Sequence, residues 1–209
     1  MFTGITEEIG RVLLVEESHL VISANIATPK LEIGGSIAVN GICLTVTGFA
    51  TNQFSVDVMP ETAARTNIAQ LHNGSEVNLE TPLTLKKPLG GHLVQGHVDG
   101  TGKLTSLMEK GEALLLKFET RPEIMHYIVS KGFIAVDGVS LTIVDSGSDF
   151  FTISIVHHTR YNTTLGIKRV GEIVNLEVDI IAKYVERFQR YYQPGITNDF
   201  LREHGFATD

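Results

Sequence analysis

Gly35-Ser-Ile-Ala-Val-Asn-Gly-Ile-Cys-Leu-Thr-Val46 and Gly132-Phe-Ile-Ala-Val-Asp-Gly-Val-Ser-Leu-Thr-Ile143 are two versions of one segment, aligned without a gap at an offset of 97 residues. The match extends until residues 35–80 and 132–177 share 15 of 46 positions. Self-similarity of this kind is the signature of a tandem repeat. The sequence therefore predicts a duplicated domain.

The limits of the two copies follow from a second, weaker match. At an offset of 92, Gly4 and Gly10 pair with Gly96 and Gly102. We predict an N-terminal lobe over residues 1–91, a C-terminal lobe over residues 92–186 and a tail over residues 187–209.

Each lobe has the pattern of short strands joined by tight turns. Residues 54–59 alternate between apolar and polar side chains, and residues 151–156 alternate in register with them. Asn40-Gly41 and Asp137-Gly138 are typical of type I′ hairpin turns, in which both central residues have positive φ. Residues 60–66 and 158–165 are expected to form short helices or turns. With little room for long helices, the pattern predicts an all-β fold of two tandem homologous antiparallel barrels.

The C-terminal region has a helical period instead. Apolar side chains recur there at three- and four-residue spacing, at Ile180, Ile181, Tyr184, Val185, Phe188, Tyr191 and Tyr192. We expect Pro194-Gly195 to end this amphipathic helix and Thr197 to cap a second, short one. Two interpretations remain open, because the helix could pack on its own barrel or form a contact between subunits.

The composition is that of a soluble globular protein, with 43% hydrophobic and 20% charged residues among 209. A formal charge of −7 argues against nucleic-acid binding, which needs clustered Lys and Arg. Cys43 is the single cysteine and favours a reducing compartment. No signal peptide is visible, and no stretch approaches the roughly 18 apolar residues of a membrane span. We expect a cytoplasmic protein with no membrane partner.

Common catalytic motifs are missing. The chain has no phosphate-cradling loop, dinucleotide fingerprint, paired-cysteine motif or nucleophile elbow. In extended strands, His92 and His97 would lie on opposite faces, and so would His157 and His158, so no metal site is predicted.

The glycine-rich segment 90–101 lies between the lobes. It is either a tight crossover or backbone that approaches a ligand closely. Cys43 is likewise either core filler or part of a site. Its repeat mate is Ser140. This correspondence suggests one site in each lobe at equivalent positions, although the two residues need not have the same role. Two similar lobes can hold two similar ligands, and this arrangement suits a reaction between identical molecules.

Four segments together resemble the riboflavin synthase family: residues 1–5, 36–46, 90–97 and 137–142, in the family's order and spacing. The resemblance covers nearly the whole chain. It implies two six-stranded barrels, and a C-terminal helix that joins three chains into a homotrimer. The sites would form between the first barrel of one chain and the second barrel of a neighbour. It also implies an association with lumazine synthase and no metal or organic cofactor. The implied reaction converts two 6,7-dimethyl-8-ribityllumazine molecules into riboflavin and 5-amino-6-(D-ribitylamino)uracil.

The resemblance also implies site residues. In the first lobe the ligand-contacting positions are Gly4, Ile5, Thr6, Cys43, Leu44, Thr45, Asp57, Val58, Met59, Pro60, Glu61 and Thr62. In the second lobe they are Gly96, His97, Val98, Lys131, Ser140, Leu141, Thr142, Ser154, Ile155, Val156, His157, His158 and Thr159. Positions that the family associates with catalysis or its support are Phe2, Thr3, Ser36, His97 and Asp179. His158 departs from members that have Glu there, as Glu61 does in the first lobe.

The implied chemistry needs a base that removes a proton from the 7-methyl group of one lumazine, and a nucleophile that adds at C7 of the other. Asp179, His97 or a water held by them could be the base, and Ser140, Cys43 or water the nucleophile. The alternative is a non-catalytic lumazine- or flavin-binding antenna protein, a class that tends to lose second-lobe ligand residues. Those residues are present here, which favours the enzyme.

Overall fold

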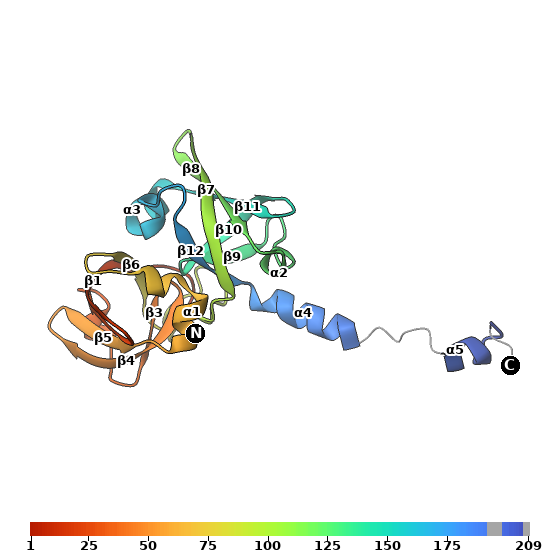
Figure 1. Ribbon diagram of the computed structural model, residues 1–209, viewed down its shortest axis with the longest axis horizontal. Coiled ribbons are helices and arrows are strands. Elements are labelled where there is room, and N and C mark those ends of the chain that lie inside the picture. Colours follow the sequence, from red (N-terminus) through yellow and green to blue (C-terminus); the bar gives the residue numbers. More distant parts are fainter. Residues whose placement is uncertain (192–197, 207–209) are drawn as a thin grey trace. The chain divides into compact units, whose positions relative to one another are not determined.

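The computed structural model describes residues 1–191 and 198–206. Residues 1–179 form one compact unit and residues 180–209 a second, smaller one. In the first unit, two six-stranded antiparallel sheets each close into a barrel (Figure 1). The prediction of two tandem β-barrels is confirmed. The division at residues 91 and 186 remains a prediction.

The two barrels repeat one topology. The first has the cyclic strand order β1-β2-β5-β4-β3-β6, and the second has the matching order β7-β8-β11-β10-β9-β12. The first consists of β1 (Glu8–Glu16), β2 (His19–Ser23), β3 (Ser36–Val39), β4 (Ile42–Ala50), β5 (Gln53–Asp57) and β6 (Glu76–Glu80). The second consists of β7 (Gly100–Lys110), β8 (Ala113–Thr120), β9 (Phe133–Val136), β10 (Val139–Ser146), β11 (Phe150–Ile155) and β12 (Ile173–Val178).

Short helices lie between the strands at matched places. The predicted segments after the fifth strand of each barrel are helical, as α1 (Pro60–Arg65) with η2 (Asn67–Gln70) and α3 (His157–Asn162) with η3 (Thr164–Gly166). Two further short helices are η1 (Thr28–Lys30) and α2 (Pro122–Met125). Because α3 is helical, His157 and His158 are not in an extended strand. Among the described residues no cluster of potential metal ligands is present.

Period-two alternation fills both barrels with apolar side chains. Along β11, for example, every second side chain is buried, from Phe151 to Ile155. Each barrel therefore has its own core cluster. A third cluster is made of Phe2, Ala38, Val94 and Ala135, with Cys43 packed against it. Its members come from both lobes, so it joins the two barrels.

The two predicted hairpin turns meet each other. Asn40 and Gly41 have φ of 46° and 75°, and Asp137 and Gly138 have φ of 44° and 79°, which confirms type I′ geometry. A Cβ built on Gly41 would lie 2.6 Å from the Gly138 backbone nitrogen, and the converse distance is also 2.6 Å. Only glycine fits at either position, so the contact between the hairpins fixes how the barrels pack.

The second unit contains α4 (Ile180–Tyr191) and α5 (Asn198–Glu203). The predicted amphipathic helix is therefore present from Ile180. The expected end at Pro194-Gly195, the cap at Thr197 and the last apolar position, Tyr192, lie outside the described residues. No helix in the described part of the chain is long and apolar enough to cross a membrane.

Candidate functional site

Two short segments, one before each barrel, form the framework of the site. We call residues 1–6 the first arm and residues 92–98 the second arm. Phe2 and Val94 pair as an isolated antiparallel bridge, with hydrogen bonds of 2.7 and 3.2 Å. The 92-residue offset of the sequence therefore corresponds to two arms that lie side by side.

A buried carboxylate at the end of the last strand of each barrel holds each arm. Glu80 accepts hydrogen bonds from the Thr3 amide at 2.7 Å, the Thr3 hydroxyl at 2.6 Å and the Gly4 amide at 2.9 Å. Its repeat mate Glu177 accepts from the Gln95 and Gly96 amides at 2.6 and 2.9 Å. Hydrogen bonds to a charged acceptor are stronger than neutral ones, so both arms are firmly fixed.

Lys87 supports the first of these carboxylates. Its ammonium lies 3.1 Å from Glu80 and 2.8 Å from Glu7. Burial opposes ionisation of Glu7, but hydrogen bonds from Lys30, Lys87 and Thr81 lower the pKa of its carboxyl to about 2. The Glu7 carboxylate is therefore charged and paired at neutral pH.

Each arm lies on the strand of the other lobe that carries the candidate nucleophile. The Ser140 amide donates to the Gly4 carbonyl at 2.8 Å, and the Cys43 amide donates to the Gly96 carbonyl at 3.0 Å. A Cβ on either glycine would lie 2.5 Å from the Cβ of its Ser140 or Cys43 partner. Each glycine segment, which the resemblance groups with the ligand contacts of its own lobe, therefore contacts a strand of the other lobe. Residues 4–6 lie with Ser140, and residues 96–98 lie with Cys43.

A pocket of about 210 Å³ opens beside Cys43. The predicted residues that line it are Cys43, Glu61, Thr62, Gly96, His97 and Val98, together with Ile42, Arg65 and Thr66. Thr45 is exposed two residues along the same face of β4, and Ser36 pairs with it on β3. The structure thus brings a thiol, an imidazole and a carboxylate to one pocket built from both lobes.

The surroundings of Ser140 include His92, which is not among the site residues predicted from the sequence. The Nδ1 atom of His92 lies 2.7 Å from Ser140 Oγ, and the ring stacks on Phe133 with centroids 5.3 Å apart. Burial lowers the pKa of the His92 imidazole, and the negative charge of Asp179 partly offsets this. The only sequence signal for this role is the Gly90-Gly91-His92 motif, and the spacing of the histidines bears only on metal binding.

Other predicted contacts divide between surface and interior. Phe2 and Thr3 are fully buried, so their side chains hold the first arm. Four side chains face the barrel interiors: Leu44, Val58, Leu141 and Ile155. Exposed or half-buried positions near the ends of β5 and β11 are Asp57, Met59, Pro60, Ser154, Val156, His157, His158 and Thr159. Thr142 is exposed on β10, Lys131 is exposed in the turn before β9 with φ of 65°, and Asp179 directly follows β12.

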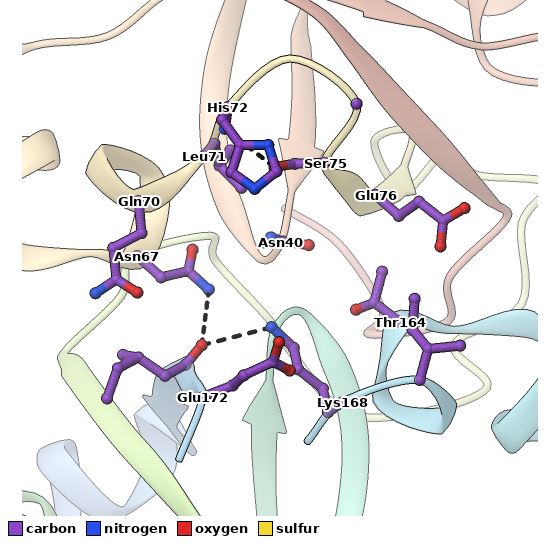
Figure 2. A pocket seen from close by; sticks show the side chains of 13 residues that line it. Asn40, Asn67, Gln70, Leu71, His72, Ser75, Glu76, Thr164, Lys168 and Glu172 are labelled. Atoms are coloured by element: carbon purple, nitrogen blue, oxygen red, sulfur yellow. Dashed lines mark hydrogen bonds between the residues drawn. The ribbon is translucent and has the colours of Figure 1, made fainter. Parts of the chain in front are cut away.

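A larger groove, of about 370 Å³, lies between the barrels and contains none of the predicted site residues (Figure 2). Two of its polar groups share one acceptor, since Asn67 Nδ2 and Lys168 Nζ donate to the Ile173 carbonyl at 3.4 and 3.5 Å. The same two side chains also hold the buried Asp137 carboxylate beneath the groove, at 2.9 and 3.2 Å. Burial raises the pKa of Asp137, and Lys168 counteracts the increase. We interpret this network as the polar seam between the lobes.

Comparison with known proteins gives one consistent result. The lumazine binding domain family model matches residues 3–82 and again residues 95–179. The chain is 42% identical to riboflavin synthase of Actinobacillus pleuropneumoniae and 44% identical to that of Bacillus subtilis, over 99% of this chain and all of each relative. It is 39% identical to the Saccharomyces cerevisiae riboflavin synthase over 90% of this chain and 85% of that one.

Solved structures show the same fold at lower identity. LumP complexed with 6,7-dimethyl-8-(1'-D-ribityl) lumazine aligns with a TM-score of 0.78 and 23% identity, over 85% of this chain and 99% of that one. LumP complexed with riboflavin aligns with a TM-score of 0.79 and 24% identity, with the same coverage.

Proposed function

Because the chain belongs to the lumazine binding domain family, with two copies of the domain in tandem, we propose that it catalyses the riboflavin synthase reaction. Two molecules of 6,7-dimethyl-8-ribityllumazine give riboflavin and 5-amino-6-(D-ribitylamino)uracil by transfer of four carbons. The observation that carries this proposal is similarity to named riboflavin synthases over the entire chain. The reciprocal placement of Cys43 and Ser140 under the two arms supports it further.

The site supplies groups of the types that the reaction needs. Asp179 and His97 are the candidate bases for the 7-methyl proton, directly or through a water, and Ser140, Cys43 or water is the nucleophile that adds at C7. Each of these steps is acid–base or addition chemistry within reach of protein side chains. The arms, tied to Glu80 and Glu177, hold the reacting groups rigidly, so orientation contributes much of the rate.

We propose that the complete site forms between chains of a homotrimer. The Cys43 pocket, at about 210 Å³, is smaller than the roughly 300–1,000 Å³ typical of ligand pockets. Met59 and Val156, near the two sites, are 69% and 61% exposed in the single chain. The apolar face of α4 offers a surface for the subunit contact. A neighbouring chain would complete the pocket and cover these side chains.

The remaining expectations belong to the same proposal. Residues 1–91 and 92–186 would act as two lumazine-binding barrels, and the tail at 187–209 would contribute to trimerisation. A cytoplasmic location is expected from the single cysteine. An association with lumazine synthase follows from the resemblance alone.

The second candidate is an antenna protein that binds lumazine or flavin without turnover, because LumP shares the fold. The identities of 42–44% to riboflavin synthases, against 23–24% to LumP, favour the enzyme. The retained Ser140, His97 and Asp179 also favour it.

The test is incubation of the purified full chain with the lumazine, followed by absorbance of riboflavin. An enzyme forms one riboflavin from two lumazines without another substrate. An antenna protein binds the lumazine, as fluorescence titration would detect, but forms no riboflavin. Heat-denatured protein is the control for spontaneous conversion.

A further inference from the structure

His92 is fixed on several sides by groups from both lobes. Its amide donates to the Thr3 carbonyl at 3.2 Å, its ring stacks on Phe133 at an interplanar angle of 12°, and its Nδ1 lies 2.7 Å from Ser140 Oγ. The residue is only 6% exposed. An imidazole held in this way has one orientation, aimed at the Ser140 hydroxyl.

The protonation of this ring suits proton transfer. Burial lowers the imidazole pKa, so the ring is neutral at physiological pH and has a free electron pair. Nε2 is buried and has no hydrogen-bond partner among the residues that the structure describes. In the tautomer with its proton on Nε2, Nδ1 accepts the hydrogen bond from Ser140 Oγ–H. The charge of Asp179 favours the imidazolium that forms when Nδ1 takes that proton.

The matched position in the other lobe lacks this partner. Cys43 aligns with Ser140 and carries the second arm as Ser140 carries the first. However, the Cys43 thiol makes no hydrogen bond to the described residues. The duplicated sites therefore differ at the atom where a nucleophile would act.

We propose that His92 is a positioning residue that holds the Ser140 hydroxyl and accepts its proton when Ser140 Oγ adds to C7 of a bound lumazine. This inference rests on the proposed function and assigns the attacked lumazine to the Ser140 side. In the step, the O–H bond breaks and its proton moves to Nδ1, while a C–O bond forms at C7. The electron pair displaced from the C7 double bond moves into the electron-poor ring, and later elimination reverses each change. The other lumazine then occupies the Cys43 pocket and loses its 7-methyl proton there.

The test compares His92→Asn and His92→Phe with the wild-type full chain in the lumazine assay. The Asn amide can hold the hydroxyl but cannot take its proton, whereas Phe retains only the stacking on Phe133. Proton transfer by a positioned side chain contributes roughly 10²–10⁴-fold. We expect both variants to lose about 100-fold or more in kcat, with KM for lumazine within about 3-fold of wild type. The exposed His126→Asn is the control.

A double-mutant cycle tests whether His92 acts through Ser140. In a Ser140→Ala background, His92→Asn should reduce kcat by no more than about 2-fold, whereas in a Cys43→Ala background the two losses should multiply. Wild-type kcat in His92→Asn would overturn the proposal, and so would equal losses in the two backgrounds. If His92→Phe does not fold, His92→Asn decides alone. A wild-type chain that forms no riboflavin would refute the proposed function itself, and with it the role of His92.

Discussion

Replacing Glu80 by Gln tests whether one buried carboxylate organises the site of the opposite lobe. Glu80 is 4% exposed, and its two oxygens receive three hydrogen bonds from Thr3 and Gly4 in addition to the ion pair with Lys87. In the variant, one oxygen becomes an NH2 group. If that group replaces Oε2, it faces the Gly4 amide, so a donor meets a donor.

The expected loss of stability follows from this geometry. One hydrogen bond to a charged group, worth about 1.5–3 kcal/mol, is lost, and the others become weaker neutral bonds. The sum is a loss of about 2–4 kcal/mol in the free energy of unfolding. For a chain of this size, 1 kcal/mol shifts Tm by about 2–4 °C, so Tm should fall by about 4–16 °C. Calorimetry or urea unfolding measures the change.

The functional effect should appear in the second lobe, although Glu80 belongs to the first barrel. The Gly4 and Thr3 carbonyls accept from the Ser140 and His92 amides, so a loosened first arm displaces both. We expect kcat to fall at least 10-fold. Hydrogen exchange should show faster exchange of the Ser140 amide, with little change at Cys43.

The matched variant is Glu177→Gln, which should reverse this pattern by loosening Gly96 over Cys43. Glu112→Gln, in the exposed turn between β7 and β8, controls for loss of charge. Equal exchange effects of Glu80→Gln at Ser140 and Cys43, or a Tm within 1 °C of wild type, would refute the cross-lobe argument.

Four further outcomes are expected. Cys43→Ser should fold normally but alter turnover or lumazine affinity. Wild-type values of both would show that Cys43 serves only in packing. Asp179→Ala should lower kcat substantially with little loss of Tm, because a carboxylate at a strand end costs little to remove, and an unchanged kcat would exclude it from the mechanism. Truncation after Lys183 should yield species smaller than a trimer in sedimentation, still able to bind lumazine but slow to convert it; a fully active monomer contradicts the shared site. Since the pKa of Glu7 is lowered from 4.5 to about 2, its charged form stabilises the fold above about pH 4.5, and this contribution is lost as the pH falls towards 2. Glu7→Gln should therefore flatten this part of the acid unfolding curve, and an unchanged curve counts against the ion pairs.

The barrels were predictable because the repeat and the turns are local signals. Asn40-Gly41 and Asp137-Gly138 specify positive φ by residue type alone, and alternation along residues 151–156 specifies which side chains face inward. Nothing in a strand pattern, however, states which lobe an arm lies on. The exchange of arms depends on contacts between residues more than 40 positions apart, such as Gly4 with Ser140. The glycines at the start of each lobe match at an offset of 92 and the later strands at an offset of 97. This difference indicates only that the start of each lobe and its later strands are separate segments of the repeat.

The His92–Ser140 pair was missed for a related reason. The prediction that His92 and His97 lie on opposite faces assumes an extended strand, but residues 92–98 belong to no named strand. His97 faces the Cys43 pocket and His92 contacts Ser140, so one short segment supplies an imidazole to each site. Two histidines five residues apart thus serve opposite lobes.

The exchanged arms bear on how a duplicated protein of this kind can arise. A lone ancestral lobe would have had its own glycine arm and its own nucleophile strand, yet each arm here lies on the strand of the other lobe. Two separate copies could have satisfied both contacts only as a twofold dimer that swapped arms. Fusion of the genes would then have preserved that symmetric exchange inside one polypeptide. It would also have allowed the two sites to diverge, so that one has a thiol and the other has a hydroxyl paired with an imidazole.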